Sequence, residues 1–206
     1  MATFIEVHPD NPQPRTVAQV VERITQGALV AFPTDSGYAL GGRLDDQGIK
    51  DRIRDIRRLD DKHHYTLLCA DFAQLGQLVH IDNSVFRAIK AATPGPYTFI
   101  LPATKVVPKR LLHAKKKTVG VRIPSHPLSQ ALLDGLGDPM LISTLLLPGD
   151  EATPTFGWDV KEALDHQVDI VIDAGEVSTE PTTVVDLSEG ESRIARYGAG
   201  DPTPFE

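Results

Sequence analysis

The chain has 206 residues and a formal net charge of −7, and 41% of its residues are apolar against 24% that are charged. These values are ordinary for a globular protein, and the length suits one α/β domain with its own core. They argue against a membrane protein, because no window approaches the roughly 20 consecutive apolar residues that cross a bilayer. The N-terminal residues lack the basic and apolar regions of a signal peptide, and the single Cys69 has no disulfide partner. We therefore expect one domain, residues 1–206, in the cytoplasm.

The predicted elements begin with a short strand at 4–7 and a helix at 14–26, which has apolar residues at helical spacing and Gly27 as its end. The stretch that follows, 27–42, is the one around which we interpret the chain. Its unbroken apolar run at 28–32 predicts a strand that is covered on both faces. Pro33 has no backbone donor and is expected to end that strand.

Side chains that can bond an oxygen-rich ligand come directly after this strand. In open α/β sheets ligands lie beyond the carboxyl ends of strands, so a binding site is expected here. The alternative is a turn whose hydroxyl and carboxylate groups satisfy only their own backbone. The polar residues are Thr34, Asp35 and Ser36, and the glycines that let the backbone turn and approach a ligand are Gly37, Gly41 and Gly42.

The rest of the chain alternates between helix and strand patterns. Helices are expected at 45–58, from 82 or 84 to 92, at 127–136 and at 158–166, with a short helical turn at 108–113. Strands are expected at 66–70, 97–101, 119–123, 140–144, 168–172, 182–186 and 193–197. Because the later strands follow one another more closely, the pattern predicts a mixed, twisted α/β sheet with flanking helices rather than a purely parallel sheet.

The basic residues are concentrated in one sector of the chain. No acidic residue lies between Asp82 and Asp134, and these 51 positions hold nine basic residues, whereas the remainder holds 12 basic against 28 acidic ones. A concentrated basic sector attracts phosphates or polyanions, and the plain alternative is a loop of solvated lysines. The complete absence of acidic residues from so long a window favours a functional role. The basic residues are Arg87, Lys90, Lys105, Lys109, Arg110, Lys115, Lys116, Lys117 and Arg122.

The chain carries neither a Gly-x-x-x-x-Gly-Lys-Ser/Thr phosphate loop nor a Gly-x-Gly-x-x-Gly motif after a strand, and it lacks the Cys/His spacing typical of zinc sites. Nucleotide binding would then rest on dispersed groups, with Arg and Lys side chains as charge clamps. Arg122 and Arg196 each end a predicted strand, where a buried structural ion pair is the alternative interpretation. We predict no metal site and assign no catalytic residue.

Several motifs together resemble the YrdC-like domain family, which includes the threonylcarbamoyl-AMP synthases. The stretch Pro33-Thr34-Asp35-Ser36-Gly37-Tyr38-Ala39-Leu40-Gly41 is similar to the family signature. Further similar motifs follow in the family's order and spacing over nearly the whole chain, which looks closest to the YciO-type branch. These motifs are Gly95-Pro96-Tyr97-Thr98, Val121-Arg122-Ile123-Pro124, His126-Pro127-Leu128, Thr182-Thr183-Val184-Val185-Asp186 and Arg196-Tyr197-Gly198.

The resemblance implies a twisted open α/β sheet with a concave, positively charged face. In the synthases, ATP with Mg as a substrate, bicarbonate and threonine give threonylcarbamoyl-AMP and pyrophosphate, and no tightly bound cofactor is implied. Carried over motif by motif, the resemblance places Thr34 and Ser36 at the amino-acid or carbamate part and Thr182 near the amino acid. The residues that it places near a substrate carboxylate or the nucleotide phosphates are Thr98, Arg122, Thr144 and Arg196.

Two stretches depart from the synthase pattern. Arg57 and Leu59 stand where the synthases have a Lys-x-Arg pair, and because Leu59 cannot clamp an anion, Arg58 or Lys62 would have to compensate. Leu146 stands where the synthases have the asparagine of a Ser-Ala-Asn motif, so an amide that donates and accepts hydrogen bonds is absent. These changes predict weakened binding of the usual substrates and a loss of synthase turnover.

We therefore expect a protein whose basic face binds nucleotide phosphates and double-stranded RNA or tRNA, a property that the resemblance also implies. The alternative is a nucleotidyltransferase of the synthase type with altered substrate clamps, and a third possibility is a sensor or an assembly partner. No membrane partner and no particular oligomeric state are predicted. Nucleotide contacts are expected from Thr34, Ser36, Arg57, Arg58, Thr98, Arg122, Thr144, Thr182 and Arg196, and RNA contacts from Lys105, Lys109, Arg110, Lys115, Lys116 and Lys117.

Overall fold

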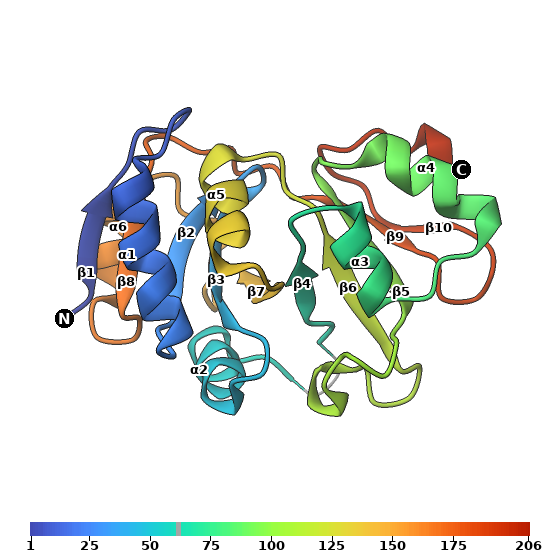
Figure 1. The fold of residues 1–206 in the computed structure, drawn as a ribbon, viewed down its shortest axis with the longest axis horizontal. Helices are drawn as coiled ribbons and strands as arrows, with labels where there is room; N and C mark the ends of the chain where they lie inside the picture. The colour runs from blue at the N-terminus through green and yellow to red at the C-terminus, as the bar shows by residue number, and fades with distance from the viewer. Residues whose placement is uncertain (61–62) are drawn as a thin grey trace.

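The computed structural model describes residues 1–60 and 63–206, and the strands in these residues form one sheet (Figure 1). Their order is β1-β8-β2-β3-β7-β4-β6-β5-β9-β10. Four neighbouring pairs are parallel and five are antiparallel, which confirms the mixed sheet predicted from the sequence. The strands are β1 (Thr3–Glu6), β2 (Val30–Thr34), β3 (Gly37–Arg43), β4 (Thr66–Leu68), β5 (Tyr97–Pro102), β6 (Thr118–Arg122), β7 (Met140–Thr144), β8 (Ile170–Asp173), β9 (Thr183–Asp186) and β10 (Arg193–Arg196).

Helices flank this sheet, and several of them, such as α1, α2 and α4, have buried apolar residues on one side only. The α-helices are α1 (Pro14–Thr25), α2 (Gln47–Arg57), α3 (Phe72–Leu78), α4 (Asn83–Ala92), α5 (Pro127–Leu136) and α6 (Gly157–Leu164), and two short 3-10 helices are η1 (Lys109–Leu111) and η2 (Thr203–Phe205). Local capping fixes several of their starts: Asp46 accepts a hydrogen bond from the Gly48 amide at 2.8 Å at the start of α2. The side chain of His126 accepts one from the Leu128 amide at 3.2 Å, so it positions α5.

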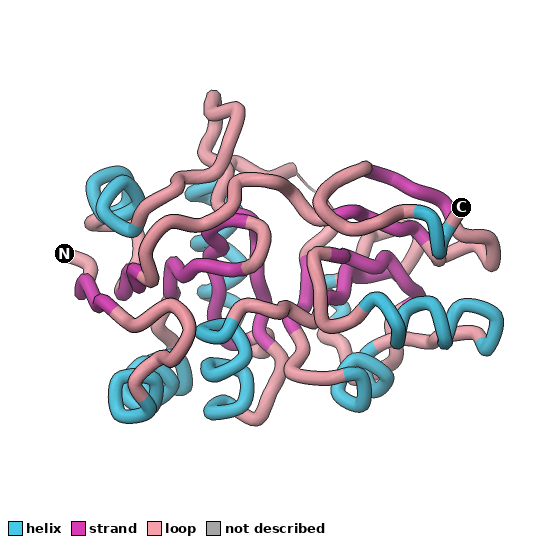
Figure 2. The backbone as a smooth tube through the Cα atoms, turned by 90° about the horizontal axis from the view of Figure 1, so that it is seen from above, coloured by secondary structure: helices cyan, strands magenta, loops and turns pink. Residues whose placement is uncertain are grey.

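The first half of the sheet, from β1 to β7, is covered by helices on both faces (Figures 1 and 2). Along β2, Val30 and Phe32 belong to the core that also holds the apolar faces of α1 and α5. Ala31 of β2, and Leu29 just before the strand, belong to the core that holds the apolar faces of α2 and α6. Because both faces of β2 are buried, its apolar run is unbroken, as the sequence predicted.

The second half, from β4 to β10, is covered differently. Phe99 of β5, Val121 of β6 and Val185 of β9 pack in the core that also contains residues of α3 and α4. The alternate residues of the same strands, such as Thr98 and Val184, point to the opposite face, since successive side chains of a strand alternate between faces. That second face carries the candidate site.

Pro33 does not end the central strand, which is a correction to the sequence prediction. β2 runs on through Pro33 to Thr34, and Pro33 pairs with Tyr38 of β3 in a hairpin. The chain accommodates proline because β8 pairs only with Val30 and Ala31 among the described residues of β2. The carbonyl oxygen of Pro33 instead accepts a hydrogen bond from Ser129 Oγ of α5 at 3.0 Å.

The strand β3 and the helix α3 have no counterpart in the sequence predictions. Gly41 and Gly42, which we expected to let the backbone approach a ligand, lie inside β3 and are required by packing. A Cβ atom at Gly41 would lie 2.8 Å from the ring of Phe32, and one at Gly42 would lie 2.9 Å from Ile49 of α2. A glycine-rich strand therefore fits between a phenylalanine on one face and a helix on the other.

Among the described residues, no helix combines the length and the apolar character that a membrane crossing needs.

Candidate functional site

A cavity of about 400 Å³ lies against the face of β5, β6 and β9 that is opposite to α3 and α4. We call it the cationic cavity, because three arginines from distant parts of the chain line it: Arg57, Arg122 and Arg196. No aspartate or glutamate is among its lining residues in the described part of the chain. The other lining residues are the hydroxyl-bearing Thr66, Thr98, Ser143, Thr144 and Thr182, the imidazole-bearing His63 and His64, and the apolar Ile100, Gly120, Ile142, Leu146 and Val184.

Arg122, at the end of β6, is 3% exposed and forms an ion pair with Asp35. The second carboxylate oxygen of Asp35 accepts hydrogen bonds from Ser125, from the amide at 3.0 Å and from Oγ at 2.9 Å. Burial lowers the pKa of Arg122, while the charge of Asp35 opposes that shift. The Nε atom of Arg122 is buried and has no hydrogen-bond partner among the described residues. The guanidinium is thus anchored through Nη2 and only partly satisfied, which suits an anion-binding group.

The hydroxyl groups of Thr34 and Ser36 are used mainly inside the β2–β3 turn. Thr34 Oγ1 donates to the carbonyl of Gly37 at 2.7 Å and accepts from the Ser36 amide at 3.2 Å. Gly37 has a φ of +95°, a conformation that favours glycine. Both hydroxyl side chains are buried and neither lines the cationic cavity. They reach it through Arg122, whose Nη2 lies 3.4 Å from Thr34 Oγ1.

Arg57, the last residue of α2, enters the cavity from another side. Its Nη1 donates to Ser143 Oγ at 2.5 Å and its Nε donates to the carbonyl of Leu146 at 3.2 Å. Burial lowers the pKa of Arg57, because removing the guanidinium from water disfavours its charged form. Leu146 therefore takes part in the site through its backbone, although its side chain lacks the amide of the synthase motif.

The neighbours of Arg57 lie elsewhere. Arg58 is the left-handed C-cap of α2, with a φ of 51°, and is not among the lining residues. Leu59 packs against the hydrophobic core. Lys62, the other residue that we considered as a compensating cation, lies outside the described residues.

Arg196, at the end of β10, is held against β9. Its Nε and Nη2 donate to the carbonyl of Thr182, at 3.1 and 2.9 Å, and Nη2 also lies 2.9 Å from Thr182 Oγ1. Thr182 Oγ1 in turn lies 2.9 Å from Thr98 Oγ1 of β5. Burial lowers the pKa of Arg196. Thr144 lines the cavity at the end of β7, so the structure brings together Arg57, Thr98, Arg122, Thr144, Thr182 and Arg196 from the sequence-predicted set.

The basic residues that we assigned to RNA contacts lie on the segment 102–117 and do not line the cationic cavity. Arg110 is half-buried and donates from Nη2 to the carbonyl of Leu44 at 2.9 Å, so it anchors the segment. Lys116 pairs with Glu189 at 2.8 Å, and Lys117 donates to the carbonyl of Ala114 at 2.8 Å. Lys105, Lys109 and Lys115 have exposed side chains.

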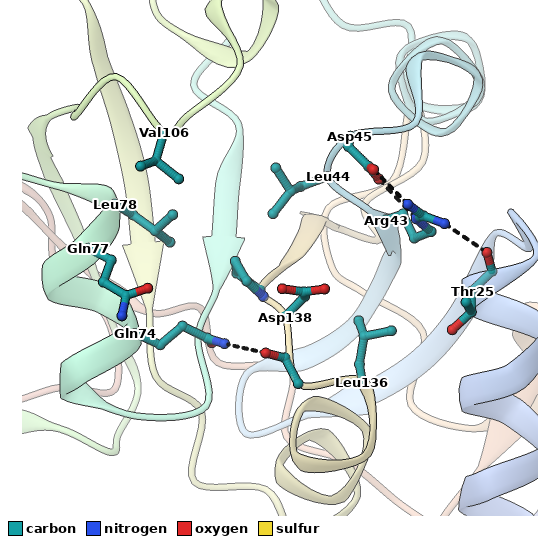
Figure 3. A pocket seen from close by; sticks show the side chains of 12 residues that line it. Thr25, Arg43, Leu44, Asp45, Gln74, Gln77, Leu78, Val106, Leu136 and Asp138 are labelled. Atoms are coloured by element: carbon teal, nitrogen blue, oxygen red, sulfur yellow. Dashed lines mark hydrogen bonds and ion pairs between the residues drawn. The ribbon is translucent and has the colours of Figure 1, made fainter.

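A second cavity of about 400 Å³ lies at the other end of β7, between α3 and the ends of α1 and α5 (Figure 3). It is a poorer candidate for an anion, because its one arginine is already used. Arg43 donates through Nε and Nη2 to Asp45, at 2.9 and 2.6 Å, and through Nη1 to the carbonyl of Thr25 at 2.9 Å. Asp138 adds a carboxylate to the lining. Within the described residues, no group of three or more potential protein ligands is placed to hold a metal ion.

No sequence pattern selects Ser143 as a cavity residue, whereas the adjacent His63 and His64 suggest a loop or a substrate-side contact rather than a metal pair. Ser143 precedes Thr144 in a buried strand, and only the fold reveals that its hydroxyl accepts a hydrogen bond from Arg57. The two histidines follow α2 without a recognisable spacing. Their place in the cavity depends on the turn from α2 into β4, which no local pattern specifies.

Comparison with known proteins shows to which family the chain belongs. The model of the Sua5/YciO/YrdC family, described as telomere recombination, matches residues 22–198. The YciO protein of Escherichia coli K12 is 47% identical over 205 residues and covers the full length of both chains. Its crystal structure superposes on this one with a TM-score of 0.97 over 100% of each chain.

More distant relatives include enzymes. A threonylcarbamoyl-AMP synthase of Vibrio vulnificus is 30% identical over 157 residues, which are 75% of this chain and 83% of the synthase. The crystal structure of Pyrococcus abyssi Sua5 complexed with L-threonine has a TM-score of 0.87 at 28% identity, and the match covers 96% of this chain and 58% of that one. The family model and the full-length match lead to one conclusion: this chain belongs to the Sua5/YciO/YrdC family.

Proposed function

We propose that this protein binds the phosphate groups of a nucleotide in the cationic cavity. The observation that carries the proposal is that Arg57, Arg122 and Arg196 line one cavity with no carboxylate among its described lining residues. Guanidinium groups in a partly dehydrated wall bind phosphate oxygens through charge-assisted hydrogen bonds. Within the described residues, the contacts of Arg57 are made by Nε and Nη1 to Leu146 and Ser143, which hold its guanidinium group in the cavity wall.

The proposal is tested by titrating the protein with ATP in a calorimeter and repeating the titration with Arg196→Met. We expect at least a tenfold loss of affinity, because a hydrogen bond to a charged group contributes about 1.5–3 kcal/mol. Arg193→Met is the matched control: Arg193 lies on the same strand, pairs with Asp186 at 3.0 Å and is outside the cavity. Equal affinities for Arg196→Met and the wild type, or no ATP binding by the wild type, would overturn the proposal.

Adenylyl transfer of the threonylcarbamoyl-AMP synthase type is the enzymatic alternative, and its support is the similarity to Sua5 and the synthases. Such a transfer asks the protein mainly to orient the substrates and stabilise negative charge. We expect little pyrophosphate release from ATP, bicarbonate and threonine, because the residues at 59 and 146 are leucines. The double variant Leu59→Arg and Leu146→Asn should raise turnover. Full synthase activity in the wild type would favour the alternative over simple binding.

RNA binding is a second function, favoured by the exposed lysines Lys105, Lys109 and Lys115 on the anchored segment 102–117. Contacts between lysines and phosphates make affinity for double-stranded RNA fall as salt rises. We expect Lys109→Glu with Lys115→Glu to weaken binding and to reduce the slope of log affinity against log salt concentration by about one for each lost phosphate contact. Arg15→Glu, an exposed charge change on α1, is the control. Binding that is absent or independent of salt would contradict this function.

A further inference from the structure

Two of the residues that line the cationic cavity are histidines, and each has its ring against another aromatic ring. The ring of His64 stacks on that of His113, with centroids 4.6 Å apart and planes 14° from parallel. The ring of His63 meets Tyr65 edge to face, with centroids 5.4 Å apart. His63 and His64 both line the cavity, and we call them the imidazole wall.

The contacts behind the imidazole wall hold the rings in place. The backbone amide of Lys116 donates to His113 Nδ1 at 3.2 Å, which fixes the ring that supports His64. Thr118 Oγ1 lies 3.4 Å from His64 Nε2 at the ring edge. Because one face of His64 is covered by His113, a ligand in the cavity meets the rest of a ring whose orientation is already set.

The imidazole wall is uncharged at neutral pH, whereas the rest of the cavity is cationic. Burial lowers the pKa of His63 to about 4, and the positive charge of Arg57 contributes to that shift. Burial also lowers the pKa of His64, with His113 and Lys116 acting in the same direction and Asp186 opposing them. The cavity thus has two chemically different regions, one for anionic groups and one of neutral aromatic rings.

We propose that the imidazole wall binds the aromatic base of a nucleotide whose phosphates lie among the arginines. This inference rests on the proposed function and deepens it, because it predicts that the cavity selects a nucleotide over an inorganic polyphosphate. A neutral aromatic ring stacks on a nucleobase, and each such contact is worth about a 5- to 150-fold change in affinity upon alanine substitution. Tripolyphosphate offers the same kind of charge and no base.

The experiment compares ATP and tripolyphosphate as ligands for the wild type, His64→Ala and His64→Phe. We expect His64→Ala to weaken ATP binding about tenfold and to leave tripolyphosphate affinity unchanged, while His64→Phe keeps most of the ATP affinity through stacking. His166→Ala, at an exposed position outside the cavity, is the control. Circular dichroism and a urea titration show whether each variant is folded. If His64→Ala does not fold, the comparison of ATP with tripolyphosphate is made with His64→Phe.

Three results would overturn the inference. Equal weakening of both ligands by His64→Ala would show a general disturbance of the cavity, and no weakening of ATP would show that the base lies elsewhere. Loss of ATP affinity in His64→Phe equal to that in His64→Ala would exclude stacking. If the wild type binds neither ligand, the proposed function itself fails, and that outcome is distinct because it appears before any variant is measured.

Discussion

The two halves of the sheet use the same alternation of side chains for different purposes. In the first half, β2 presents Val30 and Phe32 to one helical layer and Ala31 to another, so its apolar residues are core on both faces. In the second half, β6 presents Val121 to the core and Arg122 to the cavity. This second face of the sheet carries the cationic cavity, whose lining residues include charged and hydroxyl-bearing side chains. The first half provides stability, and the second combines stability on one face with a binding surface on the other.

The largest expected difference between the two halves is in how much the truncation of a side chain lowers the free energy of unfolding. Phe32→Ala removes a fully buried ring from the first half and should lower the free energy of unfolding by about 3–5 kcal/mol, because a cavity remains. Val184→Ala, on the half-buried surface of the cationic cavity, should cost less than about 1 kcal/mol. Urea unfolding followed by circular dichroism measures both values. Similar losses for the two variants would contradict the division into a doubly covered half and an open one.

The ion pair between Asp35 and Arg122 joins the halves, since Asp35 comes from the β2–β3 turn and Arg122 from β6. Asp35→Leu should lower the free energy of unfolding by about 3 kcal/mol, because it leaves a buried guanidinium without its carboxylate. Adding Arg122→Leu to that variant should recover part of the loss, since the unpaired charge is then removed. A double variant less stable than Asp35→Leu would show that Arg122 stabilises the fold by packing rather than through this pair.

The smallest of the three effects concerns His63, which lines the cationic cavity. The pKa of a histidine in the unfolded chain is near 6.5, whereas burial lowers the pKa of His63 in the folded protein to about 4. Between these values the unfolded state binds more protons, so stability present above pH 6.5 is lost as the pH falls. A pKa shift of this size corresponds to about 3 kcal/mol, and because His63 is partly exposed we expect a contribution of about 2 kcal/mol. His63→Asn should flatten the stability profile between pH 6.5 and 4, and an unchanged profile would exclude His63 as the source.

Much of the fold could be predicted from the sequence because the periodicities are strong. The unbroken run at 28–32 indicates burial on both faces, and Pro127 marks the start of α5, which the structure confirms. The sequence pattern does not predict the hairpin partner β3, because its glycines are typical of turns. Packing requires these glycines, since a Cβ atom at Gly41 would meet the ring of Phe32 and one at Gly42 would meet Ile49. Such packing requirements join residues from separate elements and leave no local pattern.

The sequence pattern indicates which arginines belong to the candidate site, but it does not indicate which residues hold them in place. Arg122 and Arg196 stand at the ends of predicted strands, where the pattern alone leaves open a ligand contact or a buried ion pair, and Arg122 does form an ion pair with Asp35. The carboxylate that holds Arg122 is far away in the chain, at Asp35, and the acceptors of Arg57 are on Ser143 and Leu146. These pairings follow from the order of the strands, which short-range sequence signals do not determine.

The position of β8 has a consequence for how the polypeptide acquires its structure during synthesis. Thr3 of β1 and Val30 of β2 both align with Ile170 of β8, so β8 lies between the two earliest strands. While the ribosome is still making the middle of the chain, β1 has no neighbour and one edge of β2 stays unpaired. Such long sequence separation slows folding and exposes hydrogen-bonding edges to other nascent chains. Emergence of β8 is therefore the event that closes this side of the sheet.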